Sequence, residues 1–210
     1  MTGWQETLKL MGAVWLSPRR AVRRILDAGL PWFYLLPLVL VYGISFTMDQ
    51  ISFRNLADFF LLRDLLLFSL LIGVGVGPLF WMIYSALFYG LGRLFRGTGR
   101  WLDVQLGVAA AMVPGVAKLI LWLMQLAVFR EEAWSELTPR IDYSFFLLLA
   151  YFFFILLDAV LIVWTIVIVA GALSEAHEFS LWKGFLLVLI GIPLIWVLFK
   201  YGLNIVLMPI

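Results

Sequence analysis

The sequence predicts an all-α, polytopic integral membrane protein with five transmembrane helices, preceded by amphipathic helices at the membrane interface. Three observations support this fold class. Hydrophobic residues make up 64% of the 210-residue chain and charged residues only 13%, whereas a soluble domain carries about 25% charged residues. The apolar runs approach or exceed the roughly 20 residues that a helix needs to cross a bilayer. Basic residues gather between alternate apolar runs, which is typical of cytoplasmic segments.

Residues 1–30 are predicted to form a cytoplasmic segment of two short helices lying on the membrane surface. Ser17 and Pro18 suit the N-cap and first position of the second helix, and Gly29 suits its end. No compact apolar core precedes a small-residue cleavage site, so we do not expect a signal peptide here. Helical spacing places four large apolar side chains on one face of the first helix: Trp4, Leu8, Met11 and Trp15.

The second of these helices is strongly basic, with Arg19, Arg20, Arg23 and Arg24 around its apolar face. Each arginine near anionic lipid headgroups is expected to add about 1 kcal/mol of attraction. One interpretation is a topology signal without a partner other than the lipid bilayer and its anionic lipids. The other is a docking surface for a cytosolic protein.

The membrane domain is predicted to occupy residues 31–210. Its five spans are placed at about 31–48, 65–91, 104–129, 143–173 and 184–208. Asp49 is expected to close the first span, and residues 50–64 to lie at the interface. The loop at 130–142 is acidic, and the loop at 174–183 is short.

The distribution of basic residues predicts the orientation. With the N-terminus inside, nine basic residues lie in inner segments and four in outer loops. This asymmetry predicts a multi-pass protein of the cell inner membrane with a cytoplasmic N-terminus and an outer C-terminus. The inner set is Lys9, Arg19, Arg20, Arg23, Arg24, Arg93, Arg96, Arg100 and Lys183; the outer set is Arg54, Arg63, Arg130 and Arg140.

Small residues at helical spacing mark expected helix contacts. Gly73 and Gly77 form a GxxxG pair in the second span, and a second small-residue face, in the third span, consists of Gly107, Ala111 and Gly115. Small side chains allow close approach of helices in a bilayer. Pro114 is expected to kink the third span. Just before that span, Gly97 and Gly99 are expected to provide the backbone freedom for a tight cytoplasmic turn.

Two charged residues are predicted to lie inside the membrane. Lys118 and Asp158 fall near the middle of the third and fourth spans at matching depth, so we expect an ion pair between them. A functional interpretation is a proton or ion relay. The alternatives are a structural pair that fixes helix register, or a protonated aspartate bonded to a neighbour. The structural interpretation is favoured, because Gln125, Ser69 and Ser85 add little polarity and transporters usually show more broken helices.

The sequence favours a non-enzymatic protein without a cofactor. The chain has no cysteine, which excludes thiolate metal sites and thiol catalysis. His177, the single histidine, is interpreted as a solvated loop residue, because a metal would need more ligands than the adjacent Glu175 and Glu178. No catalytic triad, catalytic carboxylate pair or phosphate-binding loop can be assembled, and no basic, aromatic groove for nucleic acid is present.

Three stretches resemble the Yip-domain family of Ypt/Rab-interacting membrane proteins, in its bacterial branch. They are WLSP at 15–18 before a basic helix, GTG at 97–99 before a small-residue helix with Pro114, and residues 171–183 with His177 and Ser180. Arg100 replaces a small hydroxyl residue of that pattern, and Ala110 and Ala111 replace an aromatic residue. The resemblance implies a polytopic membrane protein without known catalysis, and in eukaryotic relatives vesicle trafficking through small GTPases.

These observations predict a membrane-organising or partner-binding role, in which the partner is another protein or a second copy of the chain. The alternative is a small-solute or ion transporter or channel that uses Lys118 and Asp158. A water path to Asp158 would favour transport, and a dry, closed helix bundle would favour the scaffold role.

Overall fold

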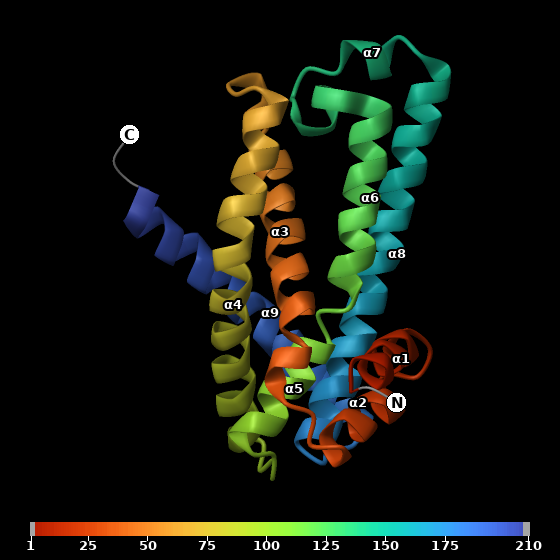
Figure 1. Ribbon diagram of the computed structural model, residues 1–210. Helices are drawn as coiled ribbons and strands as arrows, with labels where there is room; N and C mark the ends of the chain where they lie inside the picture. The colour runs from red at the N-terminus through yellow and green to blue at the C-terminus, as the bar shows by residue number, and fades with distance from the viewer. Residues whose placement is uncertain (1–2, 208–210) are drawn as a thin grey trace. The chain divides into compact units, whose positions relative to one another are not determined.

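The protein is described from a computed structural model, which defines residues 3–207. Within that range every regular element is helical (Figure 1). The α-helices are α1 (Gly3–Leu16), α2 (Pro18–Asp27), α3 (Leu36–Phe53), α4 (Leu62–Leu94), α5 (Trp101–Ala110), α6 (Pro114–Phe129), α7 (Pro139–Asp142), α8 (Phe145–Ala176) and α9 (Leu181–Leu207). Short 3₁₀ helices cover Trp32–Tyr34, Leu56–Asp58 and Arg130–Trp134.

Four helical segments are long and apolar enough to cross a membrane: Leu36–Phe53, Leu62–Leu94, Trp101–Trp134 and Phe145–Ala176. They match the first four predicted spans, which supports the class of multi-pass membrane protein. The fifth predicted span falls on α9, whose apolar part within the described residues, Leu181–Ile195, is shorter. Its predicted end at residue 208 lies outside the described residues.

The first span begins and ends about five residues later than the sequence suggested. Pro31 keeps an extended backbone, with φ −58° and ψ 134°. Pro37 lies in the first turn of α3, where a missing N–H costs nothing. The helix then runs past Asp49 to Phe53, and Asn55 turns the chain with a left-handed φ of 51°. Asp49 is therefore inside α3 rather than at its end.

The third span is interrupted rather than kinked. Proline has no N–H to bond the carbonyl four residues earlier. Instead, Met112 and Val113 donate to the carbonyls three residues before them, at 3.1 and 3.3 Å. Pro114 then starts α6, and residues 111–113 separate it from α5. The expected single face of Gly107, Ala111 and Gly115 is consequently divided between two helices.

The chain forms two compact units. Unit 1 consists of Met1–Leu30, Met82–Val108 and Ile166–Ile210, and unit 2 of Pro31–Trp81 and Ala109–Thr165. In unit 2, α3 lies beside α4 and α6 beside α8 (Figure 1). Its two apolar clusters are Met48, Ile51, Leu65, Trp122 and Trp134, and Leu121, Phe129, Ile141 and Phe154. Outside them α8 exposes its apolar side chains, as a lipid-facing helix does.

Glycines bring the backbones of α3 and α4 into direct contact in unit 2. A Cβ added to Gly73 would lie 2.5 Å from the Cα of Ile44, and one added to Gly77 would overlap the carbonyl of Val39. On the α3 side, Gly43 faces both of these α4 glycines. The GxxxG pair therefore lies at a helix contact that no larger residue fits without displacement.

In unit 1 the helix α2 begins and ends where Pro18 and Gly29 indicated. Pro18 occupies the first turn of α2, and Gly29, with a φ of 57°, follows its end. Ser17 is the N-cap residue, but its hydroxyl donates to the carbonyl of Ala13 at 3.3 Å instead of capping α2. The apolar face of α2 is buried within the protein, because Val22 and Ile25 are almost fully covered.

Candidate functional sites

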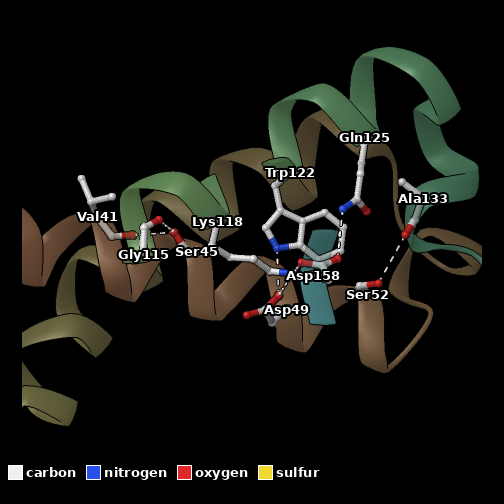
Figure 2. Close-up of polar contacts among 10 residues, drawn as sticks. All are labelled: Val41, Ser45, Asp49, Ser52, Gly115, Lys118, Trp122, Gln125, Ala133 and Asp158. Carbon is white, nitrogen blue, oxygen red and sulfur yellow. Dashed lines mark hydrogen bonds and ion pairs between the residues drawn. The ribbon is translucent and has the colours of Figure 1, made fainter. Parts of the chain in front are cut away.

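Three charged side chains meet inside unit 2. Lys118 of α6 contacts Oδ1 of Asp158 on α8, and its ammonium lies 3.2 Å from Oδ1 of Asp49 on α3 (Figure 2). The ammonium also lies 4.8 Å from the centroid of the Trp122 ring, a distance at which the ring face attracts a cation. We call Asp49, Lys118 and Asp158 the charge triad.

Neutral donors complete the hydrogen bonding of the triad. Nε1 of Trp122 donates to Oδ1 of Asp49 at 2.9 Å, and Nε2 of Gln125 donates to Oδ2 of Asp158 at 3.2 Å (Figure 2). Lys118, Trp122 and Gln125 follow one another at spacings of four and three, so α6 presents all three from one face. Ion pairs that are also hydrogen-bonded repay more of the cost of removing charge from water.

Two serine bonds hold α3 against α6 and against the 3₁₀ helix that follows it. Ser45 donates to the carbonyl of Gly115 at 2.8 Å and lies 2.9 Å from that of Val41 in its own helix. Ser52 donates to the carbonyl of Ala133 at 3.3 Å (Figure 2). These bonds fix the register of α3, and with it the position of Asp49.

Sequence reasoning identified two members of the triad and missed the third. The sequence predicts that Asp49 ends a span and that Gln125 adds little polarity, whereas Asp49 pairs with Lys118 and Gln125 bonds to Asp158. A usable signal was present: Ser45, Asp49 and Ser52 recur at spacings of four and three, which places three polar side chains on one face of an apolar helix.

In unit 1 the basic helix α2 is bound to the end of α8. Arg19 and Arg23 contact the two carboxylate oxygens of Glu175 at 2.6 and 2.9 Å. The Glu175 side chain is only 7% exposed, against 47% and 46% for the two arginines. Two of the four arginines expected at the lipid surface therefore have a protein partner, while Arg20 and Arg24 are exposed.

His177 is buried, which corrects its interpretation as a solvated loop residue. Its side chain is 1% exposed and stacks on Phe179, with ring centroids 5.3 Å apart. Nε2 lies 3.2 Å from the carbonyl oxygen of Phe88; because a carbonyl can only accept, Nε2 carries the proton. Burial lowers the pKa of His177 and Arg93 lowers it further, whereas the Phe88 bond and Asp103 oppose these effects.

Three glycines provide the space that the imidazole of His177 occupies. A Cβ at Gly92 would overlap the ring, one at Gly97 would lie 2.7 Å from Nδ1, and one at Gly99 would lie 3.0 Å from it. The tight turn itself uses Arg96, which has a φ of 64°, whereas Gly97 and Gly99 do not adopt positive φ. Their missing side chains, rather than their backbone freedom, explain the GTG sequence.

The GTG turn is also bonded to the segment that carries His177. The backbone N–H of Thr98 donates to the carbonyl of His177 at 3.3 Å, and its hydroxyl donates to Glu178 at 2.8 Å. Arg93 donates to the carbonyl of Gly97 at 3.3 Å. Unit 1 thus joins α2, the GTG turn and residues 174–180 into one polar surface, which we call the polar platform.

The remaining small residues lie at separate contacts. Gly107 faces Ala172 and Ala176 of α8: a Cβ added to Gly107 would lie 3.5 Å from the carbonyl oxygen of Ala172 and 3.4 Å from the Cβ of Ala176. Gly115 faces Tyr42 of α3, and a Cβ added to Gly115 would lie 3.0 Å from the Cα of Tyr42. Ala111 is buried in the turn between α5 and α6. Among the described residues no group of three or more metal-binding side chains occurs.

These features define a multi-pass membrane protein whose polar side chains gather at one centre in each unit. The model of the Yip1 domain matches residues 12–202. That match covers most of the chain, and the protein therefore belongs to the Yip1 domain family. No curated protein and no solved structure shows a significant match to the chain. Members of the family are generally non-enzymatic proteins of transport and trafficking.

Proposed function

We propose that this Yip1-domain protein is a non-enzymatic, five-span protein of the cell inner membrane that organises the membrane or binds a protein partner through its polar platform. The observation that carries the proposal is the junction of three distant segments in unit 1. Glu175 binds Arg19 and Arg23 of α2, and the adjacent His177 is enclosed by glycines of the GTG region. A surface formed jointly by three segments suits recognition of a partner.

The charge of unit 1 supports an inner, membrane-facing position for the platform. Unit 1 contains ten basic and five acidic residues, whereas unit 2 contains five basic and eight acidic residues. Positive segments are retained on the cytoplasmic side, where the leaflet carries anionic lipids. We assign Arg20 and Arg24, which are exposed, to contact with lipid headgroups or an acidic partner.

Site-specific photo-crosslinking in native membranes tests the partner-binding role. A photoreactive residue at Arg20, Arg24 or Thr98 is expected to form one recurrent protein adduct, and Glu175→Gln is expected to abolish it because α2 loses its anchor. Arg63, which is 78% exposed in unit 2, is the matched control position. Absence of any platform adduct, or the same adduct from Arg63, would contradict the proposal.

The lipid-binding part is tested separately by native mass spectrometry of the purified protein. Arg20→Gln with Arg24→Gln is expected to reduce retention of anionic lipid, and to leave zwitterionic lipid unchanged. Arg54→Gln with Arg63→Gln is the matched double substitution in unit 2. Equal lipid retention by both double variants would remove the lipid assignment from α2.

A second candidate function, transport of an ion or small solute, is favoured by the charge triad alone. Charged residues inside spans often mark ion pathways. Flux across proteoliposomes that is lost in Asp158→Asn, with unchanged thermal stability, would support transport over the organising role. Flux that is absent from the wild-type protein, for protons and for small cations, would remove this candidate.

A further inference from the structure

The formal charges of the charge triad do not sum to zero. Two carboxylates share one ammonium, so the ionised triad has a formal charge of −1. Within the described residues, the charged groups that face Asp49 are Lys118 from α6 and Asp158 from α8. The remaining partners, Trp122 and Gln125, are neutral donors. An uncompensated charge within a span is unfavourable, and one additional positive charge removes it.

We propose that the triad holds one exchangeable proton, which enters and leaves through Asp49. This inference goes beyond the proposed function and does not depend on it. Lys118 and Trp122 both bond to the same oxygen of Asp49, Oδ1. A proton on Oδ2 therefore leaves both interactions in place. In Asp158, by contrast, Lys118 engages one oxygen and Gln125 the other.

Asp49 is also the more accessible of the two carboxyl groups. Its side chain is 39% exposed, compared with 25% for Asp158. It lies four residues before the end of α3 at Phe53, which is about 6 Å along the helix axis at 1.5 Å per residue. Proton exchange accordingly takes place on the side of the loop that follows α3.

A proton fits this site better than a metal ion. The Lys118 ammonium already contacts both carboxylates from the position that a bridging cation would need. Metal ions such as Ca²⁺ and Mg²⁺ require six or more oxygen ligands, and among the described residues no group of three metal-binding side chains occurs. A proton needs only one oxygen atom.

Infrared spectroscopy of the protein in lipid nanodiscs tests the inference, because a protonated carboxyl group has its own carbonyl stretch. At neutral pH the wild-type protein is expected to show one such group, which disappears on alkaline titration. Asp49→Asn and Asp158→Asn are each expected to lose the band, since each leaves one carboxylate for one ammonium. Asp64→Asn, an exposed position paired with Arg63, is the matched control and is expected to keep it.

Asp49→Asn retains the pair of Lys118 with Asp158, so we expect it to fold, and its thermal unfolding verifies this. Absence of the band from the wild-type protein at neutral pH, or its survival in both aspartate variants, would overturn the inference. The carbonyl band is also measured at constant pH in sodium chloride, in potassium chloride and in choline chloride, which supplies no metal cation. Loss of the band in sodium or potassium chloride alone would assign the site to that metal cation and overturn the proton assignment.

Discussion

The imidazole ring of His177 occupies the space in which Gly92 would carry a side chain. A Cβ at Gly92 would lie only 2.7 Å from Cδ2 of the ring and would overlap two further ring atoms. Two residues earlier in the same helix, Gly90 has nothing within 4 Å of its built Cβ. The two glycines therefore serve as a matched pair for testing how His177 is packed.

Gly92→Ala should lower the free energy of unfolding by about 1–3 kcal/mol, because the ring must shift to admit the methyl group. Gly90→Ala should raise it by roughly 0.5–1 kcal/mol, because alanine suits a helix better than glycine. Thermal and denaturant unfolding in detergent measure both changes. Equal effects of the two substitutions would contradict the packing of His177 against Gly92.

The stability of unit 1 should depend on pH through His177. Burial lowers the pKa of this histidine in the folded state, while the unfolded pKa is about 6.5. The unfolded chain therefore binds a proton more readily, and stability falls as pH drops below about 6.5. His177→Gln keeps an N–H donor without titrating, so the stability advantage of the wild-type protein should shrink in acid. A constant difference between the two proteins across this pH range would refute the prediction.

Leucine should be tolerated poorly at Gly77, because its side chain would enter the backbone of α3 at Val39. Gly77→Leu should destabilise the protein by more than Gly75→Leu, since Gly75 faces open space. It should also cost more than Leu66→Ala. Melting temperatures of the three variants in one detergent give the comparison. A Gly77→Leu protein as stable as Gly75→Leu would place the α3–α4 contact elsewhere.

Lys118 and Asp158 should be energetically coupled. Lys118→Met leaves both carboxylates without their ammonium; because these side chains are 19–39% exposed, the loss should be smaller than the roughly 3–5 kcal/mol of a broken, fully buried pair. Lys118→Met combined with Asp158→Leu should lose less than the sum of the single changes, as a double-mutant cycle on thermal stability measures. Repeating the cycle in a protein that carries Asp49→Asn measures how much Asp49 contributes to the coupling between Lys118 and Asp158. Additive losses would mean that the contact contributes no net energy.

The basic-residue asymmetry predicts where cytoplasmic reporters work. A reporter that is active only in the cytoplasm should function at the N-terminus and within residues 97–99. It should fail at the C-terminus and in the loop at 130–142, if α9 is the fifth span. Reporter activity at the C-terminus would replace the five-span arrangement with an even number of spans.

The spans could be predicted because hydrophobicity over some 20 residues averages out local detail. Boundaries could not, because they depend on single residues. The extended backbone at Pro31 delays the first helix, and the missing N–H of Pro114 divides the third. The sequence predicts that Pro114 bends the third span. The turn at residues 111–113 shows that one helix ends there and another begins.

The polar residues were harder to interpret, because their environment comes from distant parts of the chain. The matching depths of Lys118 and Asp158 follow from counting along two neighbouring spans. The position of Asp49 depends on where α3 ends, and the sequence predicts that end before Asp49, whereas α3 continues to Phe53. His177 is followed by polar residues in the sequence, but its burial is produced by glycines about 80 residues earlier. The polarity of the residues next to His177 in the sequence cannot reveal burial by distant residues.

The anchor of α2 has a consequence for biosynthesis. Glu175 follows Arg19 by 156 residues, and at about 5–20 residues per second a ribosome needs roughly 8–31 s to add them. During that interval α2 has been made, but its carboxylate partner has not. The four arginines of α2 therefore exist before the carboxylate that binds two of them is made. A chain that stops before Glu175 would lack this anchor for α2.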